Sequence, residues 1–222
     1  MTNQVLSIEN LQVAFATDAG TVNAVQGVSL QVNAGEVLAI VGESGSGKSV
    51  TARSVLGLLP STAVTRGAIY LNGKDVVSLS REQLREARGS DAAMVFQEPS
   101  TALNPVYTVG WQIIEGLRAH TPKGQKFDSK AARKKAIEIL RLVGIPEPET
   151  RIDYYPHQFS GGQKQRVVIA SALVLEPKLI LADEPTTALD VTVQAEILDL
   201  LRASRETTGA AIVLITHNMG VV

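Results

Sequence analysis

The run Val37-Leu-Ala-Ile-Val-Gly-Glu-Ser-Gly-Ser-Gly-Lys-Ser49 decides the fold class of this chain. Its first five residues are continuously apolar, which is typical of a strand covered on both faces. The rest matches the pattern G-x-x-x-x-G-K-[ST], and residues 50–59 after it have a helical pattern. A strand, a glycine-rich loop and a helix in this order predict an α/β protein whose loop binds a phosphate group.

The residue types of this loop suit phosphate binding. Glycines let backbone N–H groups turn toward an anion without a clash from Cβ, and the helix presents its N-terminus to that anion. We expect Lys48 to reach the β- and γ-phosphates and the Ser49 hydroxyl to bind Mg²⁺. A chance match by a glycine-rich turn is the alternative, which the flanking strand and helix disfavour. The predicted nucleotide-binding residues of this region are Gly42, Glu43, Ser44, Gly45, Ser46, Gly47, Lys48, Ser49 and Val50.

A second apolar run, residues 179–182, ends in Asp183 and Glu184. We expect Asp183, at the tip of the strand, to hold Mg²⁺ through water. Glu184 is placed to accept a proton from the water that attacks the γ-phosphate. Acidic pairs are also common at solvated strand ends, so this interpretation depends on the phosphate loop in the same chain.

The remaining pattern alternates strands and helices. Residues 211–215 read as a third buried strand, and residues 5–30 as antiparallel strands with turns. Four helices are expected, starting at a capping box of Ser80 and Gln83, at 128–129, near 160 and at 190. Residues 97–171 are richer in proline, charge and helix than their flanks. We interpret residues 1–222 as one domain, with a helical lobe (97–171) inserted into an α/β core (1–96 and 172–222).

Composition excludes several classes. The chain has 222 residues, 45% of them apolar, a formal net charge of -1 and no cysteine. Disulfides and thiolate metal sites are therefore excluded, and a domain that mainly coats nucleic acid is disfavoured. The N-terminus does not resemble a signal peptide, and no window is long and apolar enough to span a bilayer. Any membrane function would need a separate partner.

The run Phe159-Ser-Gly-Gly-Gln163 supplies a second anion site at a helix N-terminus. One phosphate loop suffices for one nucleotide, so a second site suggests that it completes the site of another chain. A merely capped helix is the alternative. The run and the motifs around it resemble those of ABC ATPases over essentially the whole chain. The resemblance implies a P-loop NTPase (RecA-like) core with a mostly parallel sheet, an antiparallel β subdomain near the N-terminus and an inserted helical subdomain.

The resemblance also implies roles for further residues. Gln97 matches the Q-loop glutamine, which touches Mg²⁺ and the attacking water and senses the membrane partner. Asp190, in Ala188-Leu-Asp190, matches the D-loop at the dimer interface, and His217 matches the histidine that contacts the γ-phosphate. Phe15 matches the aromatic residue that stacks on adenine, although a phenylalanine in a strand is more often part of a core. The implied catalytic residues are Lys48, Gln97, Glu184 and His217, the metal ligands Ser49, Gln97 and Asp183, and the residues that bind the other chain's nucleotide Ser160, Gly161, Gly162 and Gln163.

Three stretches, residues 96–105, 155–163 and 185–194, resemble the branch that energises uptake of dipeptides, oligopeptides and, in some members, nickel or glutathione. This branch implies ATP and Mg²⁺ as cofactors, a second ATPase subunit, permease subunits bound through the helical lobe, and indirectly a solute-binding protein. It implies no nucleic acid and a peripheral place on the cytoplasmic face of the cell membrane. Relatives continue well past the histidine, so we expect a C-terminally shortened chain.

Two other functions remain open from the sequence. A soluble ABC ATPase of DNA repair or translation would carry a basic groove or a long coiled-coil insertion, which the near-neutral charge and the short lobe disfavour. A nucleotide-gated regulatory module is disfavoured because Lys48, Glu184 and His217 are all intact.

Overall fold

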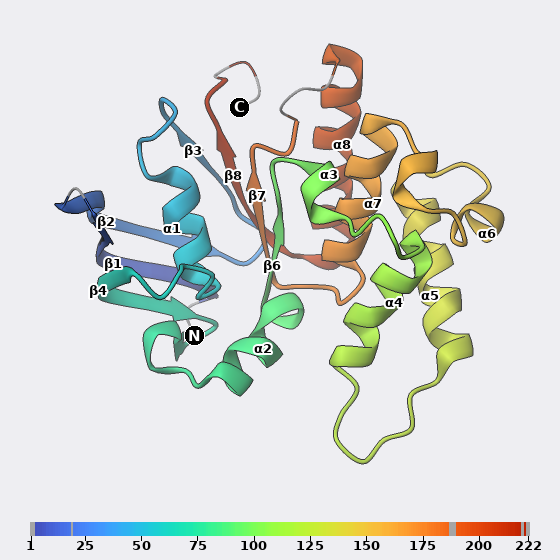
Figure 1. Cartoon of the computed structure of the whole chain (residues 1–222), viewed down its shortest axis with the longest axis horizontal. Helices are drawn as coiled ribbons and strands as arrows, with labels where there is room; N and C mark the ends of the chain where they lie inside the picture. Colours follow the sequence, from blue (N-terminus) through green and yellow to red (C-terminus); the bar gives the residue numbers. More distant parts are fainter. Residues whose placement is uncertain (1–2, 19, 187–189, 219, 221–222) are drawn as a thin grey trace.

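Two β-sheets form the framework of the computed structural model, which describes residues 3–18, 20–186, 190–218 and 220 (Figure 1). Within these residues, one sheet is antiparallel with the strand order β2-β1-β4-β5, and the other is parallel with the order β3-β8-β7-β6. The antiparallel strands are β1 (Gln4–Thr17), β2 (Gly20–Asn33), β4 (Ala63–Leu71) and β5 (Lys74–Asp75). The parallel strands are β3 (Val37–Val41), β6 (Ala92–Val95), β7 (Leu179–Asp183) and β8 (Ala211–Thr216). The predicted fold class is confirmed.

The four helices predicted from capping signals begin where expected. Ser80 and Ser160 each form a capping box with the glutamine three residues later, and Asp128 caps the helix that follows it. The helices are α1 (Lys48–Val55), α2 (Arg81–Ser90), α3 (Pro99–Ala102), α4 (Val109–Ala119), α5 (Ser129–Leu142), α6 (Pro148–Arg151), α7 (Gly161–Leu173) and α8 (Val191–Thr208), with 3-10 turns η1 (Val76–Ser78) and η2 (Pro156–Gln158). Helix α1 ends before residue 59, where its helical pattern ends, because Gly57 takes a left-handed conformation with φ 58°. Helix α7 ends two residues before the expected Leu175.

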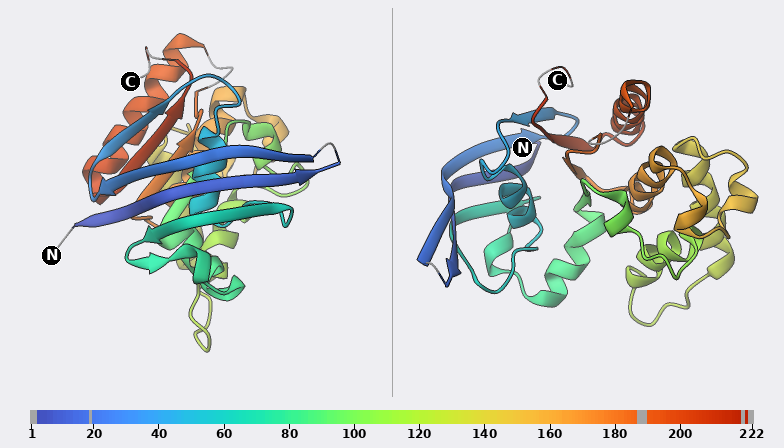
Figure 2. Two further views of the ribbon diagram at one scale, coloured as in Figure 1. Left: turned by 90° about the vertical axis from the view of Figure 1, so that its left-hand side faces the viewer. Right: turned by 45° about the horizontal axis from the view of Figure 1, so that its top comes forward.

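The parallel sheet is covered on both faces. Leu179 and Leu181 of β7 belong to a cluster that also contains residues of α1 and the antiparallel sheet. Ile180 and Ala182, which point to the opposite face, belong to a second cluster with α4, α5, α7 and α8. Figure 2 shows the antiparallel sheet on the far side of α1 from the helices of the second cluster. One face of the parallel sheet therefore packs against α1, and the opposite face packs against the helices of the second cluster.

The strand before the phosphate loop departs from the prediction. We expected β3 to be buried on both faces, but Val37 is 43% exposed and Val41 is 38% exposed. The reason is position: β3 lies at the edge of the parallel sheet and pairs only with β8 among the described strands. An apolar run alone does not distinguish a central strand from an edge strand.

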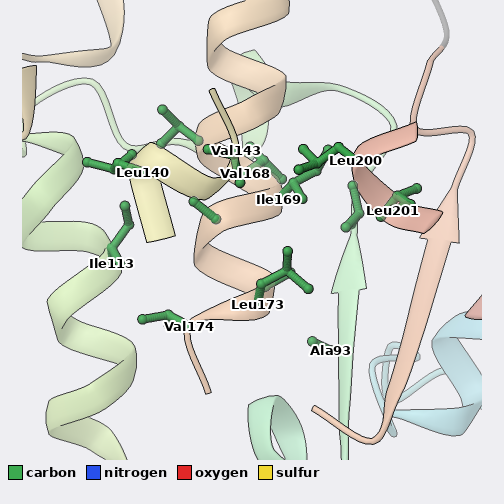
Figure 3. Packing of buried hydrophobic residues seen from close by; sticks show 14 of the residues in the cluster. Ala93, Ile113, Leu140, Val143, Val168, Ile169, Leu173, Val174, Leu200 and Leu201 are labelled. Atoms are coloured by element: carbon green, nitrogen blue, oxygen red, sulfur yellow. The ribbon is translucent and has the colours of Figure 1, made fainter. Parts of the chain in front are cut away.

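Helices α3–α7 lie between β6 and β7 in the sequence and on one side of the molecule in space (Figure 1). Helix α7 packs against α4 and α5 and also against β6 and α8. Its side chains Val168, Ile169 and Leu173 lie in the middle of the shared cluster (Figure 3). The boundary proposed after residue 171 falls inside this helix. Within the described ranges, no helix has the length and the hydrophobicity that a bilayer span requires.

Candidate functional site

The loop between β3 and α1 curves around a pocket of about 610 Å³. It needs glycine at position 47, where φ is 89° and an added Cβ would lie 2.3 Å from the carbonyl oxygen of Ala24. Strand β2 therefore passes close to the loop, and Gly47 starts α1 in a conformation that other residues rarely adopt. The pocket is lined by Ala24, Glu43, Ser44, Gly45, Ser46, Gly47, Lys48, Ser49, Val50, Gln97, Glu184 and His217.

Lys48 lies inside the curve of this loop. Its side chain is buried, with 8% exposure, and its Nζ donates to the carbonyl oxygens of Gly42 and Glu43, both at 2.7 Å. A weaker contact joins Nζ to Ser46 Oγ at 3.4 Å. The loop thus holds one positive charge at the wall of the pocket, beside the N-terminus of α1. Both features favour an anion.

Ser49 and Asp183 meet beside the loop. Ser49 Oγ donates to Asp183 Oδ1 at 2.7 Å, and Asp183 is 1% exposed. Burial raises the pKa of the Asp183 carboxyl, while the Ser49 hydrogen bond and the positive charge of Arg53 act in the opposite direction. These two oxygen groups suit Mg²⁺, which prefers a few oxygen ligands from protein together with water and phosphate. No cluster of three or more acidic, histidine or cysteine side chains suited to a metal occurs in the part of the chain described here.

Glu184, which follows β7, contacts one residue that follows β6 and one that follows β8. Gln97 Nε2 donates to Glu184 Oε2 at 3.0 Å, and His217 Nδ1 lies 3.1 Å from the same oxygen. The Glu184 side chain is only 12% exposed, and its backbone N–H donates to Ile215 of β8 at 2.9 Å. Its own backbone has φ 47°, a value that few non-glycine residues adopt. The carboxylate is therefore held in a defined orientation at the pocket.

The topology explains why these residues meet. Gln97 follows β6, His217 follows β8, and the phosphate loop follows β3. Asp183 is the last residue of β7, and Glu184 follows it. All four strands are parallel, so their carboxyl ends lie along one edge of the sheet, where open α/β sheets bind ligands. The structure therefore brings Lys48, Ser49, Gln97, Asp183, Glu184 and His217 together.

The segment predicted to be a second anion site does not line this pocket. Ser160 Oγ accepts from the backbone N–H of Gln163 at 3.3 Å, and Gln163 Oε1 accepts from the N–H of Ser160 at 3.1 Å. An added Cβ at Gly162 would lie 2.9 Å from Val193, so α7 and α8 approach closely there. None of residues 160–163 lines the pocket. Asp190 is the N-cap residue of α8, whereas Ala188 and Leu189 lie outside the described residues.

Phe15 is also not among the residues that line the pocket. It lies on β1 opposite Val22 and Ala63 and packs, half-buried, against the cluster under the antiparallel sheet. Conversely, Ala24 lines the pocket although sequence analysis did not single it out. Ala24 contributes its backbone, which lies beside Gly47. The alanine side chain therefore gives no sign of this role in the sequence.

Known proteins resemble this chain in sequence and in structure. The family described as "ABC transporter" matches residues 25–187. The dipeptide transport ATP-binding protein DppD of Bacillus subtilis is 54% identical over 221 residues, which are 99% of this chain and 65% of that protein. The oligopeptide transport ATP-binding protein OppD of Mycobacterium tuberculosis is 52% identical over 98% of this chain and 35% of its own length. The chain therefore spans about two thirds of the first relative and about one third of the second.

The solved structures agree with the sequence matches. The dimeric ATP-binding cassette MJ0796 in a post-hydrolysis state, bound to ADP and Pi, has a TM-score of 0.85 and 30% identity. That match covers 97% of this chain and 89% of the other. The chain belongs to the ABC transporter family. Within it, the chain groups with the ATP-binding proteins of the Dpp/Opp branch, as its motifs predicted.

Proposed function

We propose that this chain binds and hydrolyses ATP and thereby powers an ABC importer for peptides or a related small solute such as nickel. The single observation that supports this most is the convergence of six side chains at four parallel strand ends: five of them line one pocket, and the sixth, Asp183, contacts Ser49 beside it. The phosphate loop, Glu184 and the histidine of that pocket, with Asp183 next to Ser49, are the groups that phosphoryl transfer to water requires. The family membership and the relatives named for dipeptide and oligopeptide transport support the same conclusion.

The residues have separate roles in this proposal. The loop and Lys48 bind the phosphates, and Phe15 stacks on the adenine. Ser49 and Asp183, with Gln97, would hold Mg²⁺, which neutralises charge on the phosphates when bound. Gln97 and His217 orient the Glu184 carboxylate through the contacts at 3.0 and 3.1 Å. Glu184 then accepts a proton from the attacking water, which makes that water a stronger nucleophile.

The predicted second anion site is the reason why we propose a dimer. Ser160, Gly161, Gly162 and Gln163 lie outside the pocket of their own chain, so we infer that they contact the nucleotide bound by a second ATPase subunit, with Asp190 at the interface. Each ATP would lie between the two chains, and loss of its γ-phosphate would let them separate. The matched cassette MJ0796 is described as a dimer, which supports this arrangement.

The proposal extends to the other partners of an importer. Helices α3–α5 after Gln97 would contact permease subunits on the cytoplasmic face of the membrane, and a solute-binding protein would act through those subunits. Exposed aromatic side chains in this region, Tyr107 and Trp111, stack at 3.9 Å between ring centroids and fit a protein contact. A repair or translation ATPase remains the second candidate, and nucleic-acid-stimulated hydrolysis would favour it.

The decisive test uses the Glu184→Gln variant, which keeps the size of the side chain but loses the proton acceptor. Light scattering with ATP and varied Mg²⁺ should detect a dimer that forms only with ATP. A variant that binds ATP and stays monomeric at all protein concentrations would contradict the two-chain site. The unchanged chain with ADP is the control, since the product lacks the γ-phosphate that joins the halves.

A further inference from the structure

Arg88 of α2 binds the end of the phosphate-loop helix. Its Nε donates to the carbonyl oxygen of Leu56, and its Nη2 donates to that of Gly57, both at 2.8 Å. Leu56 is the C-cap residue of α1, where carbonyl groups lack a partner within the helix. One guanidinium therefore supplies two hydrogen bonds and a positive charge at the end of α1, and both stabilise a helix C-terminus.

The backbone around Arg88 leaves room for a second contact. Helix α2 is kinked at Arg88 and Gly89, whose φ and ψ are not helical. Gly89 has φ 96°, which favours glycine, and an added Cβ would lie 2.5 Å from Leu175 and 3.3 Å from His120. Residues that follow α4 and α7 therefore approach the kink closely.

His120 connects this kink to the helices α3–α7. It is the C-cap residue of α4, and its Nε2 lies 2.7 Å from the carbonyl oxygen of Arg88. Its Nδ1 lies 2.9 Å from the carbonyl oxygen of Gly116, one turn earlier in α4. In Figure 1, α2 lies between α1 and α4. Consecutive contacts of one residue, Arg88, therefore join the end of α4 to the end of α1.

We propose that Arg88 is a positioning residue for phosphate binding, and that the helices α3–α7 hold it in place through His120. Helix α1 has only eight residues and is about 12 Å long, so a shift of its C-terminus also moves its N-terminus. Lys48 and Ser49 lie at that N-terminus. The inference rests on the proposed binding of ATP at the phosphate loop. It connects the helices α3–α7 to the nucleotide by contacts that do not include Gln97.

A purely structural role is the competing explanation. In that case Arg88 and His120 stabilise the fold, and their loss lowers Tm without changing the affinity for ATP. A positioning role predicts a change in affinity as well. If α1 without Arg88 occupies its binding position about a tenth of the time, the apparent affinity falls about tenfold, because only that fraction of the molecules binds.

The experiment measures the Kd of ATP by titration calorimetry at a temperature where every variant is folded, and Tm without nucleotide. Arg88→Met removes both hydrogen bonds to α1, and we expect ATP affinity to fall about tenfold. His120→Ala leaves the guanidinium in place and removes only the bond to the Arg88 carbonyl, so we expect a loss of about threefold.

The double variant tests whether His120 acts through Arg88. We expect it to lose about tenfold in ATP affinity, like Arg88→Met alone, whereas independent effects would multiply to about thirtyfold. The milder Arg88→Lys keeps the charge but has donors on one nitrogen only, so it should lose about threefold. This variant carries the same test if Arg88→Met fails to fold.

Lys123→Ala supplies a matched control. Lys123 Nζ lies 2.6 Å from Glu82 Oε1, which also joins the α4–α5 connection to α2. Glu82 lies in the first turn of α2 and has no hydrogen bond to α1 within the described ranges. Lys123→Ala should therefore leave ATP affinity unchanged.

Two results would overturn the inference. One is unchanged ATP affinity in Arg88→Met together with a lower Tm, which is the result of a structural role. The other is a loss of about thirtyfold in the double variant, since His120 would then act independently of Arg88. If the unchanged chain itself does not bind ATP, the proposed function fails instead, so the two failures are distinguishable.

Discussion

The phosphate loop and the segment 160–163 are both rich in glycine and serine and both start a helix, but their surroundings differ. Around the loop lie two carboxylates, a histidine and a glutamine from three other strand ends. Segment 160–163 contacts its own capping box and Val193. Local composition therefore predicts an anion site at both segments, whereas only the neighbours distinguish the segment for which we propose catalysis from the one that offers hydroxyl and backbone donors alone.

The largest expected effect is on ATP turnover, which we assign to the residues around the phosphate loop and not to segment 160–163. Glu184→Gln retains a side chain that can contact Gln97 and His217 but cannot accept a proton. We expect turnover to fall about 10²–10⁴-fold, the usual contribution of a positioned base, with ATP binding retained. Steady-state phosphate release measures the effect. A hydrolysis rate equal to that of the unchanged chain would remove Glu184 from the role of base.

The next effect concerns binding within one chain. Lys48→Ala removes the positive charge that the loop holds at 2.7 Å from two carbonyl oxygens. We expect ATP affinity to fall about 100-fold, since a hydrogen bond to a charged group contributes about 1.5–3 kcal/mol. Titration calorimetry gives the affinity. Lys74→Ala is the control, because it removes an ion pair with Asp91 outside the pocket and should affect stability without affecting ATP affinity.

The third effect tests segment 160–163 itself, and the chain offers a close control. Ser160→Ala and Ser80→Ala each remove the serine of a capping box in which Oγ accepts at 3.3 Å. Both should cost about 0.5–2 kcal/mol of stability. Only Ser160→Ala should also weaken ATP-driven dimerisation, by about tenfold or more, because each chain loses one bond to the other chain's nucleotide. Equal dimerisation of the two variants would leave Ser160 with a capping role alone.

Much of the fold followed from local signals in the sequence. Capping residues Ser80, Asp128 and Ser160 each start a helix as predicted, because a side chain that satisfies free N–H groups acts within one turn. The phosphate loop was predictable for the same reason, since its glycines, lysine and serine are contiguous. The convergence of Gln97, Glu184 and His217 was inferred from a family resemblance, and the parallel sheet explains it physically.

Features that depend on distant neighbours were not predictable. The exposure of β3 depends on its place at the sheet edge, which its own apolar residues do not encode. Ala24 enters the pocket because β2 crosses near Gly47, and an alanine gives no chemical signal of this.

The smallest expected effect decides whether Phe15 belongs to the pocket or to the core. Phe15 packs against the cluster under the antiparallel sheet, while the resemblance assigns it to adenine. Stacking on a base contributes about 1–3 kcal/mol. Since the partly buried ring already packs against the core, we expect Phe15→Ala to weaken ATP binding by only about fivefold, and Phe15→Tyr to restore it. Val13→Ala, two residues away on the same buried face of β1, should lower Tm without changing ATP affinity. If Phe15→Ala behaves like Val13→Ala, the ring is a core residue, because stacking on adenine is the only one of its two roles that ATP binding measures.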